Sequence, residues 1–279
     1  MKIAITSPAG KVDSGKLAAG VSFLSSLGHE VLLGETLTAE EFWTAGSVEL
    51  RAGELMKFWT DDSIDVVWAA RGGFGCAHLL DSLDWAVLPG HEKILCGHSD
   101  ISVLHLAFMA KGVKRGVSAA MPAVEFSDSE VDSLTTKSTF ELVKDGSSVR
   151  CEEFQKCRVL KGGRLKGRLI PVTLSVLSSL CGSDFLPDFN GAVLVIEDIN
   201  EHGYRLDGYL NQLRLSGILS KLSGLVFADF NNCASELELN YIYNKYTGLI
   251  NGTVLSGLPF GHCKPRLSLP VGEDIDLEL

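Results

Sequence analysis

Residues 64–75 read IDVVWAARGGFG, a short apolar run followed at once by a glycine-rich loop. Ile64–Ala69 has the length of one buried strand, and the glycines after it let the chain turn sharply. The same order returns at Ile94–Gly97, which precedes a helix-like segment at Leu104–Lys111. Short apolar runs that alternate with longer amphipathic stretches predict a parallel sheet covered by helices.

The chain before this stretch shows the same alternation. Lys2–Ile5 is a strand candidate, and Glu30–Leu33 is a second one. Between them Ser14–Leu27 has a helical pattern that stops at Gly28, a common residue at the end of a helix. The first half is therefore predicted to be an α/β domain with a parallel sheet, Rossmann-like or flavodoxin-like.

The second half carries more strand candidates than helix candidates. Ala192–Ile196, Gly224–Phe227 and Thr253–Leu255 are apolar runs of strand length, and Leu174–Leu180 has the composition of an apolar helix. A β-rich second domain is therefore expected.

A polar, serine-rich stretch between Ser127 and Arg150 separates the two halves. Such composition is typical of a loop or a connection between domains. We therefore expect an N-terminal domain at residues 1–145, a connection at 146–163 and a C-terminal domain at 164–279.

Composition excludes several classes of function. The formal net charge of -10, from 25 basic and 35 acidic residues, offers no basic stripe for nucleic acid. Seven cysteines without a CxxC pair predict reduced thiols in a reducing compartment. The first residues lack the apolar run of a signal peptide, and no segment is long enough to cross a bilayer. We therefore expect a cytoplasmic protein that binds neither nucleic acid nor membrane.

A serine lies at the end of a predicted strand, where a parallel sheet commonly places catalytic residues. Ser99 follows the strand candidate Ile94–Gly97 and precedes a helix candidate. A sharp strand-to-helix turn presents a hydroxyl to substrate, and the helix N-terminus directs N–H groups at a developing oxyanion. Ser99 or Asp100 could equally cap the helix. The usual GxSxG pattern is also incomplete, because Ile101 replaces the second glycine.

A serine nucleophile needs a base and a carboxylate that orients the base. Glu197 and Asp198 directly follow the apolar run Ala192–Ile196, and His262 lies in the turn-rich segment Gly257–His262. Taken singly, acids at strand ends are usually solvated, and a lone loop histidine is usually a surface residue. The glycine-rich loop Ala70–Gly75 adds a place where backbone can approach a ligand closely.

Taken together, these segments resemble the LD-carboxypeptidases, or muramoyl-tetrapeptide carboxypeptidases, whose relatives include the peptidases that confer self-immunity to microcin C. The resemblance runs nearly end to end. The matching segments are Ser7–Gly10, Arg71–Gly75, Gly97–Ile101, Ile196–Asp198 with Tyr204 and Asp207, and Pro259–His262.

The resemblance implies roles for particular residues. Ser99 is then the nucleophile, His262 the base and Glu197 the residue that orients the imidazole. It also implies an oxyanion hole of backbone amides, which we assign to Asp100 and to the loop at Gly72 and Gly73.

The resemblance further implies an α/β N-terminal domain, a β-rich C-terminal domain, a site at their interface and a homodimer. The expected substrate is a small peptide, cleaved between an L-centre and a D-amino acid at a free C-terminus, as in recycled cell-wall tetrapeptides. No metal or organic cofactor is expected. Arg71 is the candidate for binding the substrate carboxylate, because a guanidinium binds carboxylates bidentately.

Two segments depart from the family pattern. Leu169–Leu174 stands where the family usually has glycine, glycine and asparagine, and Ser118–Pro122 stands where it usually has histidine, glycine and proline. These departures remove polar groups from the expected cleft and leave the natural substrate open. A hydrolase of aminoacyl-nucleotide amides, like the microcin C peptidases, or an inactive binding homologue stays an alternative.

Two further interpretations remain. Residues 10–17, GKVDSGKL, follow a strand and open a helix as a phosphate-binding loop does, but Leu17 replaces the Ser or Thr that ligates magnesium. Cys96 or Cys263 could serve as a thiol nucleophile, Cys263 being adjacent to His262. Reactive thiols need an electropositive site, which sequence alone does not reveal.

Overall fold

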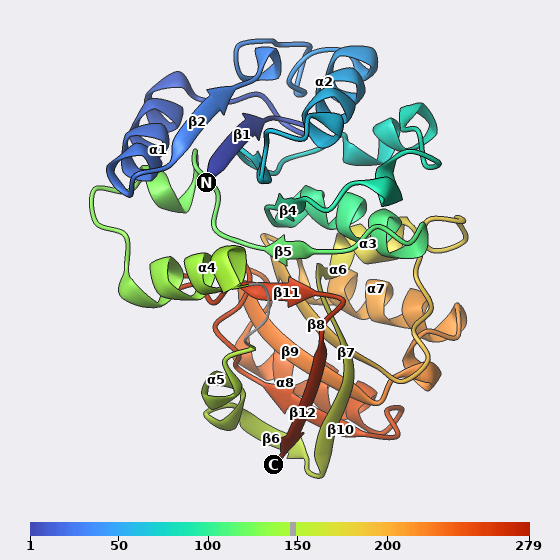
Figure 1. Ribbon diagram of the computed structural model, residues 1–279. Coiled ribbons are helices and arrows are strands. Elements are labelled where there is room, and N and C mark those ends of the chain that lie inside the picture. The colour runs from blue at the N-terminus through green and yellow to red at the C-terminus, as the bar shows by residue number, and fades with distance from the viewer. Residues whose placement is uncertain (146–148) are drawn as a thin grey trace.

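The chain folds into two sheets, each with helices packed on it (Figure 1). The computed structural model describes residues 1–145 and 149–279, so the first part of the expected connection at 146–163 lies outside the described residues. Both sheets are mostly parallel. The α/β class predicted from the sequence is confirmed.

The first sheet has six strands in the order β11-β5-β4-β3-β1-β2. Its parallel strands are β1 (Lys2–Thr6), β2 (Glu30–Leu33), β3 (Val66–Ala69), β4 (Ile94–Cys96) and β5 (Gly116–Ser118). Every residue of β3 is buried, because helices and loops cover both faces of the sheet. The strands expected from the sequence in this half are confirmed, whereas β5 was not expected.

Four helices accompany this sheet: α1 (Ser14–Ser26), α2 (Val48–Thr60), α3 (Ser102–Ala110) and α4 (Ser133–Asp145). The side chain of Asp13 caps α1 by accepting the N–H of Lys16, and Gly28 follows its end with a φ of 82°. The sequence did not predict α2, because its buried face includes Arg51 and Glu54, which interrupt the apolar pattern.

The second sheet has six strands in the order β12-β7-β8-β9-β10-β6. These are β6 (Arg158–Lys161), β7 (Arg164–Thr173), β8 (Ala192–Ile199), β9 (Gly224–Asn231), β10 (Thr253–Ser256) and β12 (Asp274–Glu278). Helices α5 (Cys151–Gln155), α6 (Leu174–Ser179), α7 (Gly203–Leu215) and α8 (Glu236–Thr247) belong to the same half. The predicted β-rich second domain thus corresponds to this sheet, and the structure adds helices between its strands.

Two short strands cross the boundaries that were predicted between the two domains and their connection. Residues 158–161, expected within the connection, form β6 at the edge of the second sheet, antiparallel to β10. β11 (Leu269–Val271) comes from the last part of the chain but pairs antiparallel with β5 of the first sheet. The two halves therefore share backbone hydrogen bonds.

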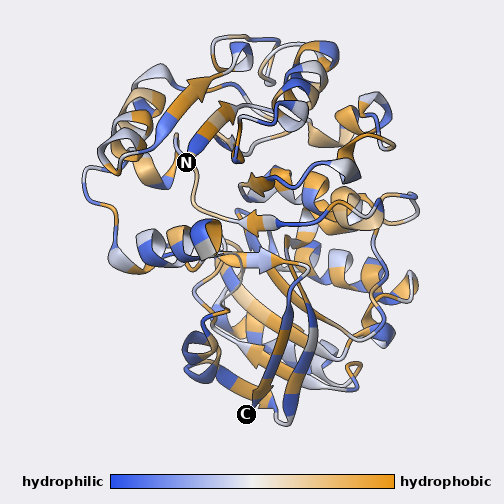
Figure 2. Cartoon of the chain, viewed as in Figure 1, coloured by the Kyte–Doolittle hydropathy of each residue, from blue (hydrophilic) through white to orange (hydrophobic). Residues whose placement is uncertain are grey.

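One hydrophobic core is continuous through both halves. It includes Leu104 and Leu106 of α3 together with Leu174 and Leu177 of α6. Figure 2 shows hydrophobic residues along the strands of both sheets and hydrophilic ones on the outer helices. Within residues 1–145 and 149–279, no helix has the length and apolar character needed to cross a membrane.

Candidate active site

Ser99 stands on a strained turn at the carboxyl end of β4. Its φ is 62°, a left-handed conformation that costs a non-glycine residue of order 1–3 kcal/mol. A short 3₁₀ turn, η4 (Ser99–Ile101), follows and leads directly into α3. The serine is partly exposed, while His98 and Asp100 beside it are buried. The turn therefore presents the hydroxyl as a nucleophile elbow does.

The glycine-rich loop lies against this serine. A Cβ atom added at Gly72 would lie 2.7 Å from Cβ and 3.0 Å from Oγ of Ser99. A Cβ atom at Gly73 would instead meet the backbone of Gly10, at 3.1 Å from its Cα. Of the two candidate glycines, Gly72 is thus the one that faces the hydroxyl.

Asp100 connects the turn to Cys76, the residue that follows the same loop. Its Oδ2 accepts the N–H of Cys76 at 2.8 Å. Its own backbone N–H lies in the first turn of a helix, where N–H groups have no intrahelical acceptor. Burial raises the pKa of the Asp100 carboxyl, although the N–H of Cys76 opposes this shift. The side chain therefore has a structural contact, and the role of the N–H in an oxyanion hole stays a prediction.

Glu197 and His262 form a close pair. Nδ1 of His262 lies 2.8 Å from Oε2 of Glu197, whose side chain is 2% exposed. The hydroxyl of Thr173 donates to the other carboxylate oxygen. Thr173 and Glu197 are register partners in the parallel pair β7 and β8, so the sheet itself places the two side chains together.

The pair is electrostatically coupled. Burial disfavours the charged form of both groups, yet the hydrogen bond and the opposite charge lower the pKa of Glu197 and raise that of His262. A carboxylate at Nδ1 fixes the tautomer that leaves Nε2 free to take a proton. His262 therefore has the arrangement of a general base.

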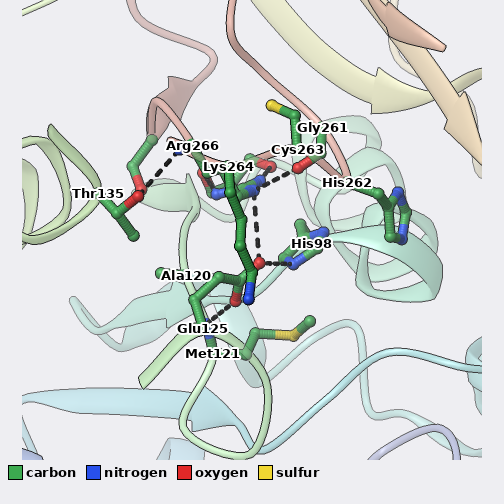
Figure 3. A network of polar contacts seen from close by, with 12 residues as sticks. His98, Ala120, Met121, Glu125, Thr135, Gly261, His262, Cys263, Lys264 and Arg266 are labelled. Atoms are coloured by element: carbon green, nitrogen blue, oxygen red, sulfur yellow. Dashed lines mark hydrogen bonds and ion pairs between the residues drawn. The ribbon is translucent and has the colours of Figure 1, made fainter. Parts of the chain in front are cut away.

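His98 links this pair to Ser99. Its ring packs edge-on against the ring of His262, with centroids 5.0 Å apart, and it precedes Ser99 in the chain. Figure 3 shows the two imidazoles side by side. Within the described residues Ser99 and His262 share no hydrogen bond. Catalytic hydrogen bonds are often long in unliganded enzymes and tighten in the substrate complex.

The sequence missed a buried network below these rings. His98 contacts Glu125, and Glu125 lies near Arg266, which is 0% exposed (Figure 3). Thr173 was also missed. No local signal identifies a buried charged residue, because its partners come from distant parts of the chain.

Two other expected residues have structural contacts. Arg71 donates from Nη1 to the carbonyl of Lys11 at 3.0 Å, and its role toward a substrate stays a prediction. Asp198, next to Glu197, accepts the N–H of Ser175 at 2.8 Å and thereby stabilises the start of α6. Burial raises the pKa of Asp198 to about 6.

A pocket adjoins the glycine-rich loop. It has a volume of about 460 Å³, and its lining includes Phe42, Trp43, Phe74 and His78. Three of these rings are exposed: Phe42 at 82%, Trp43 at 64% and Phe74 at 52%. Apolar surface beside the glycine-rich loop is therefore open to a ligand.

The alternative sites lack the geometry they need. The carboxylate of Asp13 caps α1, where a phosphate-binding loop would receive an anion. Burial raises the pKa of Cys96, and it raises the pKa of Cys263 to about 12, so both are protonated thiols at neutral pH. Among the described residues, no group of three or more His, Cys, Asp or Glu side chains is placed to hold a metal.

Comparison with known families and proteins gives consistent matches. Residues 3–118 match the LD-carboxypeptidase N-terminal domain, and residues 166–277 match the LD-carboxypeptidase C-terminal domain. The chain is 31% identical over 275 residues to the probable murein peptide carboxypeptidase of Bacillus subtilis (strain 168), covering 97% of this chain and 86% of that protein.

Two further matches cover nearly the whole chain. The microcin C7 self-immunity protein MccF of Escherichia coli is 25% identical over 305 residues, which cover 98% of this chain and 88% of that protein. The crystal structure of muramoyltetrapeptide carboxypeptidase from Oxalobacter formigenes has a TM-score of 0.88 at 30% identity, covering 100% of this chain and 95% of that one. From the matched domains and this shared two-domain fold, the chain belongs to the LD-carboxypeptidase family.

Proposed function

We propose that the chain is a serine carboxypeptidase that cleaves an L,D-peptide bond at a free C-terminus, as in murein tetrapeptides. The observation that carries this proposal is the Glu197–His262 pair at 2.8 Å, which meets the strained Ser99 turn through His98. The family, and the activities after which its relatives are named, support the carboxypeptidase activity and the peptide class.

The proposed reaction has two steps. Oγ of Ser99 attacks the carbonyl carbon while Nε2 of His262 takes its proton, and the proton then passes to the leaving amine. Water hydrolyses the acyl-enzyme with His262 again as base. Backbone N–H groups of Asp100 and Gly72 stabilise the oxyanion, and Glu197 holds the imidazole.

Substrate binding follows from neighbouring groups. Arg71 is proposed to bind the free carboxylate, and the pocket beside Phe74 offers room for other parts of the peptide. Gly73 is proposed to support the loop that carries the oxyanion-binding N–H of Gly72. We further propose that the protein is cytoplasmic and forms a homodimer.

A product assay tests this function. The purified protein is incubated with murein tetrapeptides that end in a D- or an L-amino acid, and the released amino acid is measured by mass spectrometry. Release from the D-ended peptide alone is expected. No release from either peptide, with a correctly folded protein, would refute the carboxypeptidase proposal.

A second candidate is an aminoacyl-nucleotide amide hydrolase. The departures at Leu169–Leu174 and Ser118–Pro122 and the match to the microcin C7 self-immunity protein favour keeping it. The same assay with an aminoacyl sulfamoyl nucleoside as substrate separates the two candidates by their kcat/KM values.

Replacing Gly72 with alanine is expected to lower kcat by about 100-fold, the cost of a displacement of about 1 Å in a reacting group. The new methyl group would have to push Ser99 away, since it would lie 2.7 Å from Cβ of Ser99. Gly208→Ala is the matched control, because a Cβ atom there meets nothing within 4 Å. Equal kcat values for both variants would remove Gly72 from the site.

A further inference from the structure

We propose that Arg266 and Glu125 are positioning residues for His262. Together with His98 they form a buried brace that holds the imidazole beside Ser99. The inference rests on the function proposed above. It assigns a role to three buried polar side chains that the reaction itself does not use.

Arg266 fastens the loop that carries the base. Its Nε donates to the carbonyl of Gly261 at 2.9 Å, one residue before His262. Its other donors reach Ser118 at the end of β5, with 3.2 Å from Nη1 to the carbonyl and 3.1 Å from Nη2 to Oγ. One guanidinium therefore ties the His262 loop to the first sheet.

Glu125 supplies the opposite charge. Its Oε1 lies 2.9 Å from Nε2 of His98 and 3.9 Å from Nε of Arg266, and its Oε2 accepts the N–H of Met121 at 2.8 Å. Burial opposes ionisation of this carboxyl, but His98 and Arg266 lower its pKa to about 2. A buried charge that loses its partner is strongly destabilising, so the three groups depend on one another.

His98 carries this arrangement to the nucleophile. Burial lowers the pKa of His98 to about 4, so its ring is neutral at pH 7 and donates from Nε2 to the Glu125 carboxylate. The same ring packs against the ring of His262, and His98 is the residue directly before Ser99 in the chain. Figure 3 shows Glu125 between His98 and Arg266. The Glu125 carboxylate thus orients both His98, the neighbour of the nucleophile, and Arg266, which holds the loop of the base.

The brace also sets the electric field at the base. The titratable and charged groups around His262 are Glu197 of β8, Asp229 of β9, His98, Glu125 and Arg266. The charge of Glu125 raises the pKa of His262, whereas the charge of Arg266 lowers it. Removing these two charges must therefore shift the pKa of His262 in opposite directions, which loss of packing alone would not do.

The test compares Arg266→Gln with Glu125→Gln. For each variant kcat and KM are measured on a murein tetrapeptide, and the His262 imidazole is titrated by NMR. Both variants are expected to lose about 100-fold in kcat with little change in KM, as for a misplaced base.

The pH dependence of kcat/KM gives the direction in which the pKa of His262 shifts in each variant. A base must be neutral to take a proton, so activity falls as the pH drops through the pKa of His262. Arg266→Gln is expected to raise this pKa and move the acidic limb of kcat/KM to higher pH. Glu125→Gln is expected to move it to lower pH.

Milder variants cover the case in which a charge deletion prevents folding. Arg266→Lys keeps the charge without the planar fork, so it should lower kcat and leave the His262 pKa in place. Ser118→Ala removes one bond to Arg266 and should lower kcat severalfold. Lys93→Gln is the control: it also removes a buried cation held by carbonyls, but at the amino end of β4, and kcat should not change.

Folded Arg266 and Glu125 variants with the kcat of the unaltered protein, or with His262 pKa shifts of the same sign, would overturn the brace. A different result bears on the proposed function. If the unaltered protein releases no amino acid from the tetrapeptide, that function fails, whereas the NMR titration still decides the brace.

Discussion

Replacing Ser99 with alanine is expected to lower kcat by about a millionfold, the loss seen when a triad that acts as a unit loses its nucleophile. The alanine retains the Cβ that faces Gly72 but lacks the Oγ that attacks the carbonyl. The rate that remains comes from oxyanion stabilisation and binding, which in triad enzymes give about 10³–10⁴ over the uncatalysed reaction.

The measurement is the rate of amino acid release, together with the dissociation constant of the uncleaved peptide by calorimetry. Binding should persist in Ser99→Ala. Ser220→Ala is a matched control, because its exposed hydroxyl bonds only to the carbonyl of Gly217 within the described residues. Wild-type turnover in Ser99→Ala would eliminate the proposed mechanism.

Replacing His262 with alanine is expected to cost a similar factor, about a millionfold in kcat, because the hydroxyl then has no base. The double variant Ser99→Ala, His262→Ala should be no slower than either single variant, since both changes remove the same step. Single-turnover rates measured on all three proteins decide the point. A double variant several hundredfold slower than both singles would show that the two residues act independently.

Cys263→Ser is the control for this second prediction. It alters the neighbour of His262 while leaving the imidazole in place, and within the described chain the thiol hydrogen-bonds only to the carbonyl of Pro265. Activity should persist. Loss of activity in Cys263→Ser with full activity in Ser99→Ala would make the thiol the nucleophile.

The sequence predicted those parts of the fold that depend on local patterns. The buried strands β1, β3, β4 and β8 appear as apolar runs, because helices or loops cover both of their faces. The short edge strands β6 and β11 have only four and three residues, too few for an apolar run to stand out. Their pairing depends on partners in distant parts of the chain.

The residues of the candidate site also fall into those that a local sequence pattern indicates and those that depend on distant partners. Ser99 and Glu197 are visible in the sequence because each follows an apolar run, and His262 because it lies in a turn-rich segment. The assignment of their roles stays a prediction, to which the structure adds the contact between Glu197 and His262. Arg266 and Glu125 could not be predicted, since Arg266 meets Ser118 across 148 residues of sequence.

The position of β11 has a consequence for biosynthesis. In the part of the chain that the structure describes, the outer edge of β5 pairs with Leu269–Val271, which are translated long after β5 itself. Until those residues leave the ribosome, the nascent first sheet exposes an unpaired edge, a surface on which other chains can add a strand. Completion of the first sheet therefore waits for the synthesis of Leu269–Val271, and termination before residue 269 would leave an aggregation-prone product.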